Sequence, residues 1–293
     1  MPDTSKRAQE PQLIDSVGPG GFTTRRTYLL PDGSHAVWTS RHHRRRLATA
    51  APGEATPLGE VLLRSLWMPW HVSWWIGVVF ALGSSLFIVG STLSLAPSLA
   101  RTWSVETSGV NAIFFAGSIP FTTAAYLQLF QAAHAGSLSS RPTRHVLLLG
   151  WCPRDIGWLS SALQLAGTLL FNVNTFDAMQ PDVDWLQQDL AIWVPDFAGS
   201  VLFLASGYLG FAETCHAYWA WKPGSLSWWV TGVNLLGCLA FLVSAVFAFV
   251  PLRSPSPDTA TLSVAFTLIG AVGFLLGSLL MLPETAAPTT VRP

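Results

Sequence analysis

The sequence predicts an all-α polytopic membrane protein whose six transmembrane helices form three tandem two-helix repeats in a pseudo-threefold arrangement. Its composition excludes an ordinary soluble domain, because 50% of the 293 residues are hydrophobic and only 11% are charged. Six apolar segments are long enough to cross about 30 Å of hydrocarbon. A glycine and phenylalanine pattern recurs in each. The segments are residues 72–96, 109–133, 157–177, 191–219, 227–250 and 262–282.

In every apolar segment a glycine is followed, four residues later, by a phenylalanine. The pairs are Gly83 and Phe87, Gly117 and Phe121, Gly167 and Phe171, Gly199 and Phe203, Gly237 and Phe241, and Gly270 and Phe274. The two positions share one face of a helix. Helices in lipid associate through close approach over small residues, and a phenylalanine fills the notch opposite a glycine. We therefore predict that these residues form the helix-packing faces.

The spacing of the glycines groups the segments into pairs. Successive glycines lie 34, 50, 32, 38 and 33 residues apart, so three near-equal intervals alternate with two longer ones. Trp74–Trp75 and Trp228–Trp229 also precede Gly83 and Gly237 at the same offset. Self-similarity at a fixed period is typical of internal repeats. The sequence thus predicts three helical hairpins that repeat in tandem within residues 71–283.

Residues 1–56 are polar and basic, and we expect a largely flexible cytoplasmic arm. An Asp32–Gly33 turn within residues 28–38 indicates a small β-hairpin. The basic run 41–46 lies close to the first span, so we expect it to contact anionic lipid headgroups rather than nucleic acid. Residues 57–70 are predicted to form an amphipathic entry helix, with Leu58, Val61, Leu62 and Leu66 on one side.

The basic residues predict the direction in which the helices cross. Of the 16 lysines and arginines, all but Arg101 and Arg253 fall in the N-terminal arm, in loops on the same side, or in the tail. Cytoplasmic loops carry an excess of such residues. We therefore expect a multi-pass protein of the bacterial cell membrane, with the N-terminus and the tail at residues 284–293 both cytoplasmic.

The two-span units resemble small bacterial membrane proteins called YrhK-like. The residues that carry the resemblance are the Gly-Ser-x-x-Phe cores, of which residues 83–87 and 199–203 match best, whereas Cys238 and Ala271 replace the serine. The resemblance covers residues 70–283 and leaves out the N-terminal arm. It implies a membrane fold and supplies no catalytic residues.

One polar constellation is expected at the cytoplasmic ends of the spans: His71, Gln131, His134, Glu213 and His216. Gln131 and Glu213 both lie fourteen residues beyond the glycine of their span. Histidine nitrogens beside a carboxylate suit zinc or iron and titrate near neutrality. The alternatives are a proton or metal site, a haem clamped by His134 and His216, and plain interhelical hydrogen bonding. The last needs no cofactor, and we predict none.

A second polar constellation is expected within the spans: Gln164, Asn172, Asn174 and Asn234. Gln164 and Asn234 share one repeat offset, and Asn174 replaces a small residue on the packing face. Polar residues inside spans mark either solute sites or interhelical hydrogen bonds. The sequence thus allows a pocket for a cation or polar solute.

No catalytic motif stands in the sequence, which favours a non-enzymatic protein. We therefore predict an integral membrane scaffold or accessory subunit, which binds anionic lipid and a protein partner or a second copy of itself. A small transporter or channel is the second hypothesis. A haem- or metal-dependent redox protein is the third.

Overall fold

The computed structural model describes residues 11–47, 57–135, 148–180, 188–249 and 257–287. Over these ranges six helices are long and apolar enough to cross a membrane, which confirms the predicted number of spans. They are α3 (Val72–Leu95), α5 (Thr107–Ala133), α6 (Ile156–Asp177), α8 (Val194–Cys215), α9 (Leu226–Phe247) and α10 (Pro257–Ala286). A π-helical turn, η1 (Gln188–Trp193), leads into α8, and a short helix, α4 (Pro97–Thr102), follows α3.

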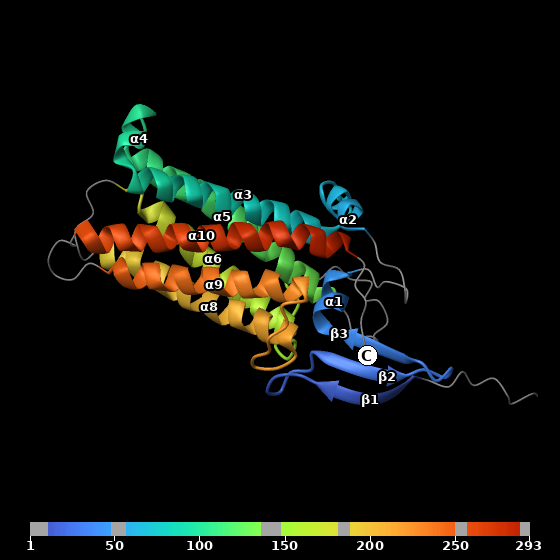
Figure 1. Ribbon diagram of the computed structural model, residues 1–293. Coiled ribbons are helices and arrows are strands. Elements are labelled where there is room, and N and C mark those ends of the chain that lie inside the picture. The colour runs from blue at the N-terminus through green and yellow to red at the C-terminus, as the bar shows by residue number, and fades with distance from the viewer. Residues whose placement is uncertain (1–10, 48–56, 136–147, 181–187, 250–256, 288–293) are drawn as a thin grey trace, which may run out of the picture.

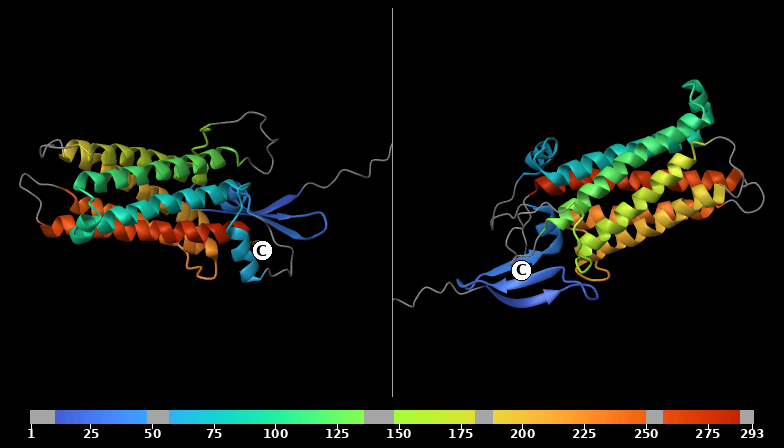
Figure 2. Two further views of the ribbon diagram at one scale, coloured as in Figure 1. Left: turned by 90° about the horizontal axis from the view of Figure 1, so that it is seen from above. Right: turned by 180° about the vertical axis from the view of Figure 1, so that it is seen from behind.

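The six long helices form a closed ring. Each packs against its neighbours in chain order, and α10 packs against α3. Figures 1 and 2 show the helices running side by side, with α4 at one end of the bundle and the N-terminal strands at the other. We call these the α4 end and the sheet end. Each helix thus presents one face to a common interior.

Within each hairpin the two helices touch backbone to backbone at the repeated glycines. A Cβ atom added to Gly83 would lie 3.0 Å from the carbonyl oxygen of Gly117. The corresponding distance is 3.1 Å both for Gly167 against Gly199 and for Gly237 against Gly270. Added Cβ atoms would also meet the phenylalanine ring of the opposite helix. The glycines therefore face the partner helix of their own hairpin, and so allow the two backbones to approach closely.

The six phenylalanines meet in the middle of the bundle. Phe87, Phe121, Phe171, Phe203, Phe241 and Phe274 are all buried and belong to one core cluster. Seven ring pairs among them have centroids 4.9–6.0 Å apart. Tilted and edge-to-face pairs of this kind stabilise a core by about 0.5–1.5 kcal/mol each beyond their area burial. We call this set the phenylalanine layer.

The Gly270→Ala substitution is expected to destabilise the α9–α10 hairpin, whereas Gly232→Ala on α9 should not. The new methyl at position 270 would lie 2.6 Å from Cδ2 of Phe241, but at position 232 it meets nothing closer than 3.7 Å. Overpacking typically costs about 1–3 kcal/mol, and alanine otherwise favours a helix over glycine by about 0.8–1 kcal/mol. Thermal unfolding in detergent measures both. Equal shifts of the two midpoints would contradict the close approach.

The N-terminal arm folds against the bundle. Strands β1 (Gln12–Val17), β2 (Arg25–Leu29) and β3 (His35–Thr39) form an antiparallel sheet in the order β1-β2-β3. Leu29 pairs with His35 across the predicted turn, where Gly33 has a φ of +80°. The prediction of a largely flexible arm is therefore wrong for residues 11–47, because backbone pairing and the helix α1 (Ser40–Arg45) hold them in place.

Two helix boundaries also differ from the prediction. Helix α8 ends at Cys215 rather than near residue 219, because His216 takes a left-handed conformation with a φ of +57°. Helix α10 continues through Pro283 to Ala286, so Glu284 belongs to the bundle and not to a tail. The entry helix, α2 (Leu58–Ser65), packs against α10, with Val61 buried and Leu58 and Leu62 exposed.

Candidate functional site

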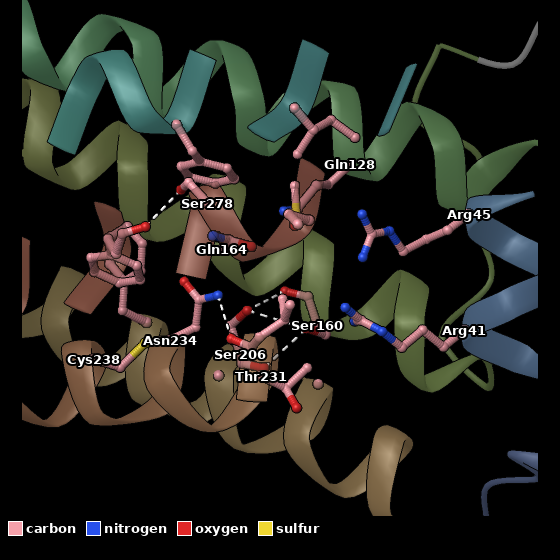
Figure 3. Close-up of a pocket in the computed structure, with 18 of the residues that line it drawn as sticks. Arg41, Arg45, Gln128, Ser160, Gln164, Ser206, Thr231, Asn234, Cys238 and Ser278 are labelled. Atoms are coloured by element: carbon pink, nitrogen blue, oxygen red, sulfur yellow. Dashed lines mark hydrogen bonds between the residues drawn. The ribbon is translucent and has the colours of Figure 1, made fainter. Parts of the chain in front are cut away.

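A polar cavity of about 90 Å³ lies inside the bundle near the sheet end (Figure 3). We call it the sheet-side chamber. Phe203 and Phe274 of the phenylalanine layer close it on one side, and arginines of α1 line the other. Its polar wall comes from five of the six long helices: Gln128, Ser160, Gln164, Ser206, Thr231, Asn234 and Ser278.

The arginines reach the chamber because α1 follows β3 directly. Arg41, Arg44 and Arg45 stand at positions i, i+3 and i+4 of this short helix and so share one face. The amide of Ser40 donates to the carbonyl of Thr24 (2.9 Å), which ties the start of α1 to the sheet. The three side chains are buried, and Figure 3 shows Arg41 and Arg45 extending from α1 toward the chamber.

Two buried glutamates hold the arginines. Arg41 donates from Nε and Nη2 to the two carboxylate oxygens of Glu284, at 3.1 Å each, and Arg45 donates from Nη1 to the same carboxylate. Arg44 donates from Nη2 to Glu213 at 2.5 Å. The hydroxyl of Ser40 donates to the other oxygen of Glu213 at 2.7 Å. The ion pairs fix α1, and with it the strands β1–β3, to α8 and α10; we call residues 11–47 the N-terminal unit.

This cluster carries one more positive charge than negative charge, since three guanidinium groups face two carboxylates. Over the described part of the chain, Nη2 of Arg45 and Nε of Arg44 are buried without a hydrogen-bond partner. Burial lowers the pKa of Arg45 to about 10, against the opposing effect of Glu284, and Arg41 and Arg44 lower it further. Arg45 therefore stays charged near neutral pH.

A second polar cavity, of about 160 Å³, lies on the other side of the phenylalanine layer. We call it the α4-side chamber. Asn111, Asn174, Asp196, Ser244 and Thr267 supply its polar wall, and three of the layer's phenylalanines line it as well. A space of only about 10 Å³, lined by the six phenylalanines and Ser118, lies between the two chambers. The three spaces share lining residues and follow one another through the bundle.

The second predicted constellation does not form one pocket. Gln164 and Asn234 line the sheet-side chamber, whereas Asn174 lines the α4-side chamber and donates to the carbonyl of Ile192 (2.8 Å). Asn172 donates to the hydroxyl of Thr122 (2.9 Å). Ten residues separate Gln164 from Asn174, which is about 15 Å along a helix. Phe171 of the phenylalanine layer lies between them.

The first predicted constellation is also dispersed. Gln131 lines the sheet-side chamber and donates to Ser73 (2.9 Å), whereas Glu213 is engaged by Arg44. His71 precedes α3, where its carbonyl accepts from the amide of Trp74. Among the residues that the structure describes, no three His, Cys, Asp or Glu side chains gather to hold a metal ion.

His134 and His216 lie in different surface hollows at the sheet end. Nδ1 of His134 is 2.8 Å from the carbonyl of Phe130, and Nδ1 of His216 is 3.1 Å from the hydroxyl of Thr24. Burial, followed by the charges of Lys222 and Arg25, lowers the pKa of His216 to about 4, so its ring is neutral at pH 7. For the alternative of a haem held by His134 and His216, the two rings therefore share no cavity in the described structure.

The sequence interpretation missed Glu284 and misplaced the arginines. Glu284 lies fourteen residues after Gly270, the same offset that joins Glu213 to Gly199 and Gln131 to Gly117. That shared offset could have predicted that Glu284 lies at the same level of the bundle as Gln131 and Glu213. The i, i+3, i+4 spacing could have predicted that the three arginines share one helix face. Headgroup contact is the wrong interpretation for Arg41, Arg44 and Arg45, because they are buried and ion-paired; Arg46 is exposed.

The chain matches no family model, no curated protein and no solved structure. A functional assignment therefore depends on the two chambers and the groups that line them.

Proposed function

We propose that this chain is a transport protein of the bacterial cell membrane, and that it carries a small solute along the axis of the six-helix bundle. The observation that carries the proposal is the succession of two polar chambers with the phenylalanine layer between them. Hydrophobic constrictions gate channels by excluding water. The described conformation corresponds to the closed state.

The polar walls support transport over a purely structural role. Polar side chains within membrane spans are costly unless they pair or face a water-filled cavity. Gln164, Thr231 and Asn234 all line the sheet-side chamber, and Thr231 and Asn234 also donate to carbonyls of their own helix. A scaffold needs the glycine and phenylalanine packing but not these chambers.

We further propose that the hairpins α3–α5, α6–α8 and α9–α10 are three repeats of a YrhK-like unit around a pseudo-threefold axis. Each hairpin has one pair of facing glycines and gives two rings to the phenylalanine layer. Parallel repeats related by an axis along the membrane normal are a known arrangement in transporters. Such repeats would place equivalent residues around a single path.

The proposed orientation puts the sheet end in the cytoplasm. The described basic residues Arg25, Arg26, Arg46 and Lys222 lie at this end, and Arg101 of α4 lies at the other. Positive charge accumulates on the cytoplasmic side of membrane proteins. The sheet-side chamber would then open toward the cytoplasm.

The proposal is tested by solute uptake into proteoliposomes. The parent protein should admit small polar solutes, with urea and formate as probes, faster than protein-free liposomes. The double variant Gln164→Leu/Asn234→Leu should lose most of this uptake, because leucines fill the sheet-side chamber with apolar surface. Thr123→Leu, on the exposed side of α5, is the matched control and should transport like the parent. Uptake that is absent from the parent, or unchanged in the double variant, would overturn the proposal.

A further inference from the structure

We infer that the sheet-side chamber is a binding site for a small monovalent anion, a halide or a short-chain carboxylate, held by Arg45 and by the amides of Gln128 and Gln164. The inference rests on the proposed function in one respect, because it takes this anion as the solute that the bundle carries.

The first argument is the charge balance of the buried cluster. Glu284 is shared by Arg41 and Arg45, and Glu213 takes Arg44, so one guanidinium charge has no carboxylate of its own. No aspartate or glutamate is among the described residues that line the chamber. A buried charge without a counter-ion is strongly unfavourable. A single bound anion would neutralise the cluster.

The second argument is a nitrogen atom that lacks an acceptor. Nη2 of Arg45 is buried without a hydrogen-bond partner in the described structure, and Arg45 is only 4% exposed. Nε of Arg44 also lacks a partner, but it lies against Gly157 of α6 and does not enter this argument. Figure 3 shows the Arg45 guanidinium extending toward the chamber wall that carries Gln128 and Gln164. A water molecule would satisfy the nitrogen and leave the charge uncompensated. An anion satisfies both, and hydrogen bonds to charged groups are the stronger kind.

The third argument is the size of the chamber and the donors around it. Its volume of about 90 Å³ equals about three water molecules at 30 Å³ each. A bromide ion, formate or acetate fits this space, whereas a nucleotide does not. Gln128 and Gln164 bring amide donors, whereas the hydroxyls of Ser160 and Thr231 already donate to the backbone carbonyls of Ser206 and Ser227. The apolar edges of Phe203 and Phe274 bound the far side, which suits the methyl group of acetate.

The test uses the full chain purified in detergent with gluconate as the bulky counter-ion. Calorimetric titration with bromide, formate and acetate should show saturable binding of at least one of them. The Arg45→Gln variant should weaken that binding by about tenfold or more, which corresponds to 1.4 kcal/mol or more. The matched control is Arg46→Gln, since Arg46 is the exposed residue that directly follows α1, and it should bind like the parent.

A second variant keeps the test decisive if Arg45→Gln fails to fold. Gln164→Leu leaves every ion pair intact and should also weaken binding. The inference falls if none of the three anions binds, or if binding survives unchanged in each folded variant. Binding of bromide alone identifies a halide site, and binding of formate or acetate identifies a carboxylate site. Urea uptake without anion binding would contradict this inference but agree with the proposed transport function. Anion binding without uptake of any solute would contradict the transport function but agree with the binding site.

Discussion

The Phe274→Ala substitution is expected to raise passive solute flux through the bundle about tenfold or more, because it removes a ring from the hydrophobic constriction. Phe274 is 3% exposed, and its ring centroid lies 5.5–5.8 Å from those of Phe121, Phe203 and Phe241. It also lines the sheet-side chamber. Its loss would therefore join that chamber to the space within the layer. Uptake of urea and formate by proteoliposomes measures the change.

The control for this variant is Phe266→Ala on the same helix. Phe266 stacks on Phe247 with centroids 5.9 Å apart and lies outside the phenylalanine layer. Truncating a phenylalanine in a core costs about 3–5 kcal/mol, so unfolding must be monitored in both proteins. A leak of equal size in the two folded variants would show that loosened packing, and not an opened constriction, admits the solute.

The Glu284→Gln substitution is expected to destabilise the docked N-terminal unit by about 3–5 kcal/mol, the usual cost of breaking a buried ion pair by removing one partner. Arg41 and Arg45 would both lose their carboxylate while remaining buried. The least costly response is for α1 to leave the bundle and rehydrate its arginines. Hydrogen exchange of the amides of α1 and β3 should then become faster, and the unfolding midpoint should fall.

The control for Glu284→Gln is Glu60→Gln, which makes the same change of charge at an exposed ion pair. Glu60 pairs with Arg64 on the surface of α2, where the two side chains are 47% and 60% exposed. Such exposed pairs contribute about 0–1 kcal/mol. Similar losses of stability in the two variants would contradict a buried cluster that holds the N-terminal unit in place.

The packing of the bundle could be read from the sequence because it depends on local periodicity. A glycine and a phenylalanine four residues apart must share a helix face. Six helices that each carry this face can all bury it when the faces point toward a common interior. The positions of Gly237 and Phe241 against Gly270 and Phe274 show this geometry directly.

The candidate site was harder to predict because its charges come from a different part of the chain. Arg44 and Glu213 are 169 residues apart, and they meet only because the sheet positions α1 over the open end of the bundle. Because the arginines lie close to the first span in the sequence, we expected lipid headgroups to be their partners. Asn174 and Gln164 line different chambers because Phe171 and the other rings of the phenylalanine layer lie between them. The sequence pattern predicted Phe171 as a helix-packing residue and gave no sign that it divides two cavities.

The most direct test of the central claim, that the phenylalanine layer separates two solvent-accessible chambers of one path, is side-specific thiol labelling in sealed vesicles. Single cysteines replace Gln164 in the sheet-side chamber and Thr267 in the α4-side chamber, after Cys152, Cys215 and Cys238 are changed to alanine. A small membrane-impermeant anionic methanethiosulfonate should modify the cysteine at position 164 only from the face that carries the sheet. It should modify the cysteine at position 267 only from the opposite face. Modification of neither cysteine from either face, or of both from both faces, would contradict the account.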